Sequence, residues 1–242
     1  LADGSLLAMG GGTCCSAQRT DTCERFNLSA QTWTYTGSMA NPTEFPPCAL
    51  LYTGEVLATW WPPQLYNPNS GQWPLTGHFV QPQRGWPGHS DHSLVVLADG
   101  RALALGVSGP NNNFMGEIYD PAAESWSVTS NPGLVRFQTE VVQTPDGRVL
   151  AAGGEAKSPN PPVDDVLGIV KWSDVYDPAS NTWRRVADMN WFREYHAVTL
   201  LLPDARVAMT GGTRIKIQYA PPSADTEALV PPSTPANIPV AL

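Results

Sequence analysis

A short motif recurs five times along this 242-residue chain, and it limits the possible folds more than any other feature. Each copy has a turn-forming pair, then a short apolar strand, then small or aromatic residues. The copies read LADGSLLAMGGG from Leu1, YTGEVLATWW from Tyr52, LADGRALALG from Leu97, TPDGRVLAAGG from Thr144 and LPDARVAMTGG from Leu202. Their turns, at Asp3, Thr53, Asp99, Asp146 and Asp204, are separated by 50, 46, 47 and 58 residues. Periods of this length predict one repeated β-sheet per copy.

Each of the first four repeats also ends in a tryptophan. The second halves read CERFNLSAQTW, PQLYNPNSGQW, GEIYDPAAESW and SDVYDPASNTW, and they end at Trp33, Trp73, Trp126 and Trp183. Four strands joined by Asp-Gly and Asp-Pro turns make a four-stranded antiparallel sheet. Because radial stacking buries both faces of such sheets, we predict an all-β propeller in which each tryptophan packs between blades. The tandem glycines would let neighbouring backbones approach closely.

The repeats also suggest boundaries. The propeller would cover residues 1–222, with repeats near 1–37, 38–77, 78–131, 132–187 and 188–222, and a proline-rich linker or tail would cover 223–242. The sequence leaves open whether five blades close by themselves, with strands from both ends completing one sheet, or belong to a larger ring. Since Leu1-Ala2-Asp3-Gly4 opens on a turn without an initiating Met, we expect a fragment or a processed chain with neighbouring domains.

Composition agrees with an all-β fold and excludes some partners. Charged residues make up 15% of the chain, and 21 Gly with 24 Pro leave little material for long helices. The net charge of −8 comes without a cluster of basic residues, so we expect no nucleic-acid partner. No apolar run approaches the roughly 20 residues that cross a bilayer, so we expect no membrane span.

The cysteines favour an oxidising compartment. Cys14, Cys15, Cys23 and Cys48 are too unevenly spaced for a zinc ribbon, and we predict two disulfides. Because adjacent cysteines rarely bridge each other, Cys14 and Cys15 would reach separately to Cys23 and Cys48, in an order that the sequence does not fix. The sequon at Asn27-Leu28-Ser29 predicts N-glycosylation. Together these features favour a secreted or cell-surface protein.

The repeats resemble the kelch repeat, and one segment resembles a particular enzyme family. Residues 193–204, REYHAVTLLLPD, resemble the catalytic propeller of galactose oxidase and glyoxal oxidase, and the likeness covers about residues 1–222. In that family the matching tyrosine and histidine ligate a single copper ion, so the resemblance implies copper ligands at Tyr195 and His196. The alternative is that the two side chains only line the channel, because kelch repeats serve enzymes and binding scaffolds alike.

The resemblance also calls for a radical tyrosine, eight residues before the turn at Thr53. The chain has Phe45 there, whose ring has no oxygen to bind copper or to hold a radical, and Arg136-Phe137-Gln138 offers no tyrosine in the fourth repeat. Oxidation of an alcohol or aldehyde at one copper needs that second redox centre. We therefore predict no catalytic residues and no required cofactor, with copper as the alternative. The predicted function is a non-catalytic extracellular module for protein interaction or structure; a fragment of a copper-radical alcohol or aldehyde oxidase is the alternative.

Two further groups suggest binding. His89-Ser90-Asp91-His92 has ligand-like residues, but in a strand the histidines would point to opposite faces, so we expect hydrogen bonding rather than metal binding. Trp60, Trp61, Trp86 and Trp191 lie outside the series of blade-end tryptophans, and the first three are the predicted ligand contacts. Exposed on a rim, they would stack on a sugar or anchor a protein, which makes a carbohydrate-binding propeller a second alternative. Packing between blades is the structural explanation that we favour for each of them.

Overall fold

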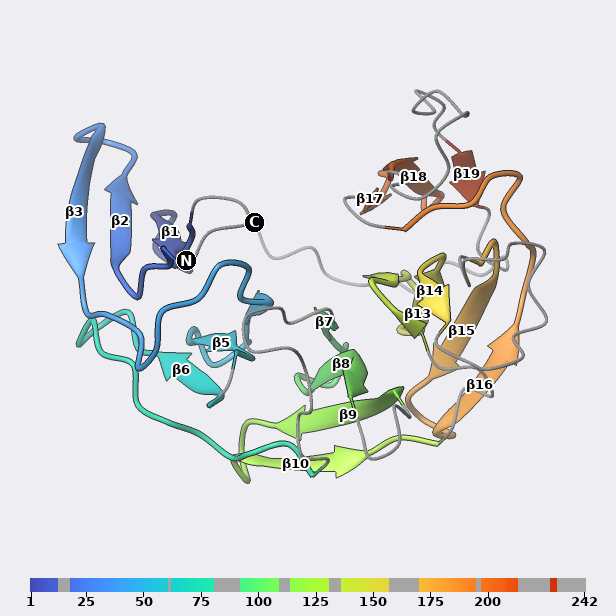
Figure 1. The fold of residues 1–242 in the computed structure, drawn as a ribbon, viewed down its shortest axis with the longest axis horizontal. Helices are drawn as coiled ribbons and strands as arrows, with labels where there is room; N and C mark the ends of the chain where they lie inside the picture. The colour runs from blue at the N-terminus through green and yellow to red at the C-terminus, as the bar shows by residue number, and fades with distance from the viewer. Residues whose placement is uncertain are drawn as a thin grey trace.

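A computed structural model describes residues 1–12, 18–60, 62–80, 92–108, 114–130, 136–156, 170–194, 197–212 and 227–229. These residues contain β-strands and no helix, and five antiparallel sheets follow one another in chain order along an open arc (Figure 1). The described part of the chain also holds no helix long and apolar enough to cross a membrane.

Each sheet is a meander built from one repeat. The first sheet comprises β1 (Leu6–Met9), β2 (Cys23–Asn27) and β3 (Thr32–Thr36), and the second comprises β4 (Cys48–Leu50), β5 (Val56–Ala58) and β6 (Gln64–Tyr66). The third comprises β7 (Ser93–Val96), β8 (Ala102–Ser108), β9 (Phe114–Asp120) and β10 (Ser125–Val128). The fourth comprises β12 (Glu140–Gln143), β13 (Val149–Ala152), β15 (Ser173–Asp177) and β16 (Thr182–Arg185). The fifth comprises β17 (Ala197–Leu201), β18 (Val207–Gly211) and β19 (Glu227–Leu229), and a separate pair joins β11 (Arg136–Phe137) to β14 (Glu155–Ala156).

The first turn has the same geometry in all five repeats, and the residues of the turn explain this geometry. In the third repeat Asp99 Oδ1 accepts the N–H of Arg101, and the N–H of Gly100 reaches the carbonyl of Leu97. The same two hydrogen bonds form at Asp3, Thr53, Asp146 and Asp204. The residue after the turn former has a left-handed φ of 81° to 91° in four glycines and of 67° in Ala205. Glycine adopts that conformation without a steric penalty, which explains the Asp-Gly signature.

A second recurring turn precedes each blade-end tryptophan. The side chains of Asn27, Asn67, Asp120 and Asp177 each accept the backbone N–H groups two and three residues later. The turn then brings an aromatic residue of one strand against the tryptophan of the next. The ring centroids are 5.0 Å apart in Phe26–Trp33, 5.0 Å in Tyr66–Trp73, 5.1 Å in Tyr119–Trp126 and 4.8 Å in Tyr176–Trp183.

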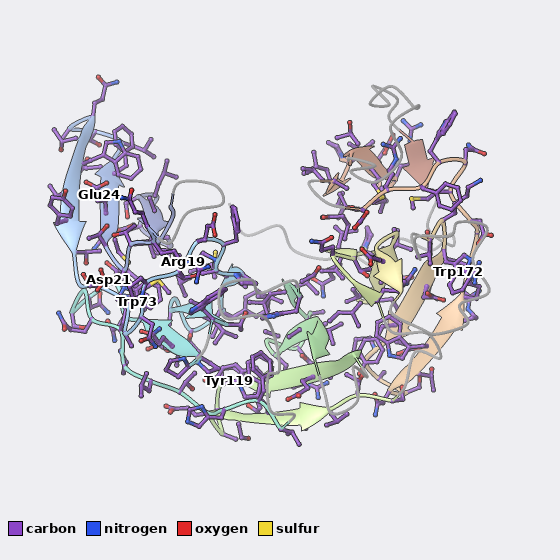
Figure 2. The ribbon with its side chains drawn as sticks, viewed as in Figure 1. Arg19, Asp21, Glu24, Trp73, Tyr119 and Trp172 are labelled. Atoms are coloured by element: carbon purple, nitrogen blue, oxygen red, sulfur yellow. The ribbon has the colours of Figure 1, made fainter. Side chains whose placement is uncertain are left out.

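The hydrophobic core lies between the sheets. Trp73 packs with Tyr66 against Cys23 of the first sheet, and Tyr119 with Trp126 packs against Leu57 of the second (Figure 2). Tyr176 and Trp183 similarly meet Leu103 and Ile118 of the third sheet. These three tyrosine–tryptophan pairs therefore face the preceding repeat, and aliphatic side chains face the following one.

Close backbone contacts join consecutive repeats at their glycines. The N–H of Gly11 donates to the carbonyl of Thr43 at 2.8 Å, and the N–H of Gly154 donates to that of Arg193 at 2.9 Å. A Cβ on Gly153 would lie 2.3 Å from the Arg193 oxygen. The glycines thus permit the close approach that the sequence predicted.

The all-β prediction and the antiparallel repeats are confirmed, whereas a closed ring is not seen among the described residues. Four strands are present in the third and fourth sheets, three in the first, second and fifth, and two in the β11–β14 pair. In the second sheet, isolated bridges from Gln64 to Leu75 and from Asn67 to Gln72 continue the pairing toward Trp73. Strand β19 lies within the range assigned to the tail, and it pairs with β18.

Candidate functional site

The copper ligands implied by the resemblance, Tyr195 and His196, lie outside the described residues. The residues before them are held firmly. Arg193 is 1% exposed and its Nη1 donates to the Gly211 carbonyl at 2.6 Å, and Glu194 is buried beside it. Arg193 and Glu194 precede β17, and the hydrogen bond from Arg193 to Gly211 links this segment to β18.

Phe45 lies in the segment that leads into β4, and its side chain is 46% exposed. The preceding Thr43 and Glu44 are buried, and Glu44 Oε2 lies 3.7 Å from Arg19 Nε. The phenyl ring has only carbon atoms, so this position supplies neither an oxygen ligand nor a phenoxyl radical. Phe45 therefore adds no ligand or redox group at this position, and the loss of the copper site stays a prediction.

His92 is buried in the junction between the second and third sheets. Its Nε2 lies 2.6 Å from Thr59 Oγ1, and its ring plane is at 79° to that of Phe79 with a centroid distance of 5.5 Å. Burial lowers the pKa of His92 to about 3, so the imidazole is neutral at physiological pH. The hydrogen-bonding role expected for His92 agrees with this geometry; His89 and Asp91 lie outside the described residues.

The fourth repeat contains a buried ion pair. Arg136 Nη2 lies 2.6 Å from Asp174 Oδ2, and Nη1 donates to the Trp172 carbonyl at 2.9 Å. Burial lowers the pKa of Arg136 to about 10, an effect that Asp174 opposes. Nearby in the chain, burial raises the pKa of Glu140 to about 7. Within the described ranges, no three His, Cys, Asp or Glu side chains gather in a way that could hold a metal ion.

The structure describes some of the residues for which disulfides and glycosylation were predicted. Cys23 is a buried free thiol and Cys48 an exposed one, while Cys14 and Cys15 lie outside the described residues. The disulfides therefore stay a prediction. Asn27 is exposed at the turn between β2 and β3, where its Oδ1 accepts the N–H groups of Ser29 and Ala30. Its glycosylation also stays a prediction.

The structure describes one of the three tryptophans proposed as ligand contacts. Trp60 is partly buried against the core between the first and second sheets, whereas Trp61 and Trp86 lie outside the described residues. Among the tryptophans that the structure describes, Trp33 and Trp191 are exposed, at 49% and 48%. Trp33 was predicted to pack between blades, but its face of the first sheet meets no other described sheet. Sequence reasoning missed it because the four tryptophan motifs look alike.

A polar pocket of about 630 Å³ lies where the first sheet meets the second. It is lined by the turn at Asp3–Ser5, by Arg25, Thr34 and Tyr35, and by the turn around Asn69. Arg25 crosses this region, since its Nη2 lies 2.5 Å from Asp3 Oδ2 and its Nη1 donates to the Pro68 carbonyl at 2.9 Å. Asn27 of the predicted sequon also lines this pocket, although it was not proposed as a ligand contact.

Comparison with known proteins gives one informative similarity. No protein-family model matches the chain. The chain is 25% identical over 148 residues to the F-box/kelch-repeat protein SKIP4 of Arabidopsis thaliana, a match that covers 56% of this chain and spans 38% of that protein. This similarity and the succession of antiparallel sheets fit a kelch-type β-propeller. The resemblance to galactose and glyoxal oxidases gains no support from it and stays a prediction.

Proposed function

We propose that this chain is a non-catalytic kelch-type β-propeller module of an extracellular protein, and that it binds protein partners. The observation that carries the proposal is Phe45, a half-exposed ring without an oxygen where the resemblance requires the redox tyrosine. The similarity to a kelch-repeat protein supports the same assignment. The site resembling a copper-radical centre is then a degenerate relic of a related enzyme.

Exposed aromatic side chains give this module a surface for a protein partner. Phe45 and Trp191 lie in the segments that lead into β4 and β17, and both are about half exposed. Aromatic residues of this kind dominate the binding energy of protein interfaces. We therefore expect partner binding to depend on these two side chains.

Two measurements on the purified chain test the proposal. In the first, copper is added together with primary alcohols or aldehydes, and the expected result is that no peroxide forms; turnover would refute the non-catalytic assignment. In the second, a partner found by cross-linking is titrated against wild type and the Phe45→Ser/Trp191→Ser double variant. We expect at least about tenfold weaker binding by the variant. Tyr52→Ser, which changes an exposed ring on the turn after β4, is the control and should bind like wild type.

The polar pocket favours carbohydrate binding as a second candidate function. Its lining groups include the Thr34 hydroxyl and the Asn69 amide, which suit the hydroxyl groups of a sugar. Trp60, the described tryptophan predicted to contact a ligand, does not line it. Glycan-array binding that is lost in a Thr34→Val/Asn69→Ala variant would favour this function, and an array without signal would remove it.

A further inference from the structure

The polar pocket between the first and second sheets lies beside a turn that lacks the arginine found in three other repeats. Two positions after the first-turn aspartate, the third, fourth and fifth repeats have Arg101, Arg148 and Arg206. Each of these arginines pairs with the aspartate of its own turn. In the first repeat this position is Ser5, which lines the pocket.

The third repeat shows what such an arginine does at a junction. Hydrogen bonds to Asp99 raise the pKa of Arg101 most, and the nearby Tyr176 and Asp120 raise it further. Asp120 forms the second turn of the same repeat, and Tyr176 belongs to the next repeat, so the guanidinium interacts with both. The matching second turn of the first repeat, at Asn27, lines the pocket. The shorter serine leaves this space open, and the cavity of about 630 Å³ has the size of a small-molecule site.

Both walls of the pocket belong to consecutive repeats that pack directly on each other. The cross-strand register places Arg25 beside Leu7 and Thr34, on the face of the first sheet opposite to Trp33. Leu7 packs against the core between the first and second sheets. Arg25 reaches the second repeat as well, through its hydrogen bond to the Pro68 carbonyl.

The pattern of the other repeats places neighbouring parts of a propeller away from this pocket. In the third repeat β7 precedes the first turn and pairs with β8 on the edge opposite to β9. A strand before the first turn of the first repeat would, by the same pattern, pair with β1 on the edge away from β2. A preceding repeat would stack on the face that carries Trp33. Neither would fill the space beside Arg25 and Thr34.

The chemistry of the lining favours a neutral ligand with many hydroxyl groups. The charged side chains of the lining are Asp3 and Arg25, whose Oδ2 and Nη2 atoms lie 2.5 Å apart, so their charges offset each other. Hydroxyl and amide groups, which both donate and accept hydrogen bonds, make up most of the other side chains, and two apolar side chains join them. These groups come from Ser29, Thr34, Ser70, Asn69, Leu28 and Pro68.

We propose that this pocket binds a short neutral oligosaccharide and that Ser5 determines whether the pocket is open. A hexose ring has hydroxyl groups around its edge and C–H groups on its faces, which match the polar and apolar groups of the lining. A carboxylate on the sugar would instead meet the negative charge of Asp3. The inference rests on carbohydrate binding, the second candidate function, and adds the class of ligand and the residue that opens the site.

Calorimetric titration of the full chain tests the proposal. The chain is produced in a host without N-glycosylation, so that Asn27 carries no sugar, and is titrated with maltotetraose, cellotetraose and mannotetraose, and with tetragalacturonic acid as the acidic probe. At least one neutral probe is expected to bind. Ser5→Arg should weaken that binding at least about tenfold, because the arginine extends into the pocket as Arg101 does at its own junction. Glu55→Arg, the same change at the matching position of the second repeat and outside the pocket, should bind like wild type.

Three results would overturn the proposal, and they differ in what else they remove. Wild type that binds no neutral probe would remove carbohydrate binding as well, while the proposed binding of protein partners would stand. Unchanged binding by Ser5→Arg, with loss in Thr34→Val/Asn69→Ala, would keep carbohydrate binding and refute the role of Ser5. Tighter binding of the acidic probe would refute the neutral class. Thermal melting establishes that each variant is folded, and Ser5→Gln, which also lengthens the side chain, replaces Ser5→Arg if that variant does not fold.

Discussion

The junction between the second and third sheets and the open face of the first sheet contain nearly the same local structure in different surroundings. Trp126 is 7% exposed, stacks 4.1 Å from Phe79 and donates its Nε1–H to the Gly77 carbonyl at 2.8 Å. Trp33 pairs with Phe26 as Trp126 pairs with Tyr119. Among the described residues, Trp33 forms no contact like those that Trp126 makes with Phe79 and Gly77. The local motif therefore builds the aromatic pair, whereas the neighbouring sheet decides how much that pair contributes to stability.

The largest expected effect comes from removing the buried indole. Trp126→Ala should lower the free energy of unfolding by about 3–5 kcal/mol, because it opens a cavity and removes the contact with Phe79. Trp33→Ala should cost less than about 1 kcal/mol in dilute solution, since half of its side chain already meets solvent. Urea denaturation of both variants measures the difference. Equal losses would show that Trp33 is as well packed as Trp126, contrary to this structure.

A glycine at a close junction gives the second effect. Gly153→Ala should destabilise the chain by about 3 kcal/mol, because the added Cβ would lie 2.3 Å from the Arg193 carbonyl oxygen and the residue has a φ of 65°. Gly54→Ala is the matched control. Gly54 also has a positive φ, of 86°, but no atom lies within 4 Å of the added Cβ. Thermal melting of the two variants separates the clash from the backbone strain; similar shifts would mean that the junction relaxes to admit a methyl group.

The sequence predicted those features of the fold that depend on interactions between residues close together in the chain. Asp99 and Gly100 form the expected turn because an Asp side chain and a flexible residue suffice for it. Burial at the ends of the arc could not be predicted, since Trp33 and Trp126 share a motif and differ only in the sheet beside them. The contact between His92 and Thr59 also escaped prediction, because it joins residues 33 positions apart across a junction.

The burial of Glu140 at a junction predicts that the free energy of unfolding depends on pH. Glu140 has a raised pKa of about 7 at the junction between the fourth and fifth sheets, and Val198 has the matching position in β17, six residues before the turn, with its side chain about half exposed. Since folding raises this pKa, the folded state holds its proton more tightly than the unfolded state. Stability is then greatest below about pH 4.5 and falls as the pH rises to about 7.

Glu140→Gln should remove this loss and stabilise the chain by about 2 kcal/mol at pH 8, with little effect at pH 4. Val198→Glu is the comparison at the exposed position, where a carboxylate stays solvated and should cost less than about 1 kcal/mol at either pH. Chemical denaturation at several pH values measures both variants. A Glu140→Gln variant whose gain does not change with pH would show that ionisation of Glu140 is not the cause.

The smallest expected effect concerns the turn of the fifth repeat. Ala205 occupies, with a φ of 67°, the position that glycine holds in the other four repeats. The left-handed conformation costs an alanine about 1 kcal/mol, and glycine avoids that cost but loses more entropy on folding. Ala205→Gly should therefore stabilise the chain by about 0.5 kcal/mol, whereas Gly100→Ala at the third repeat should destabilise it by about 1 kcal/mol. The melting temperature is expected to rise in Ala205→Gly and to fall in Gly100→Ala. If Ala205→Gly destabilised the chain instead, contacts of the Ala205 methyl group would contribute more to stability than the backbone conformation of the turn. The five turns would then share a geometry but differ in energy.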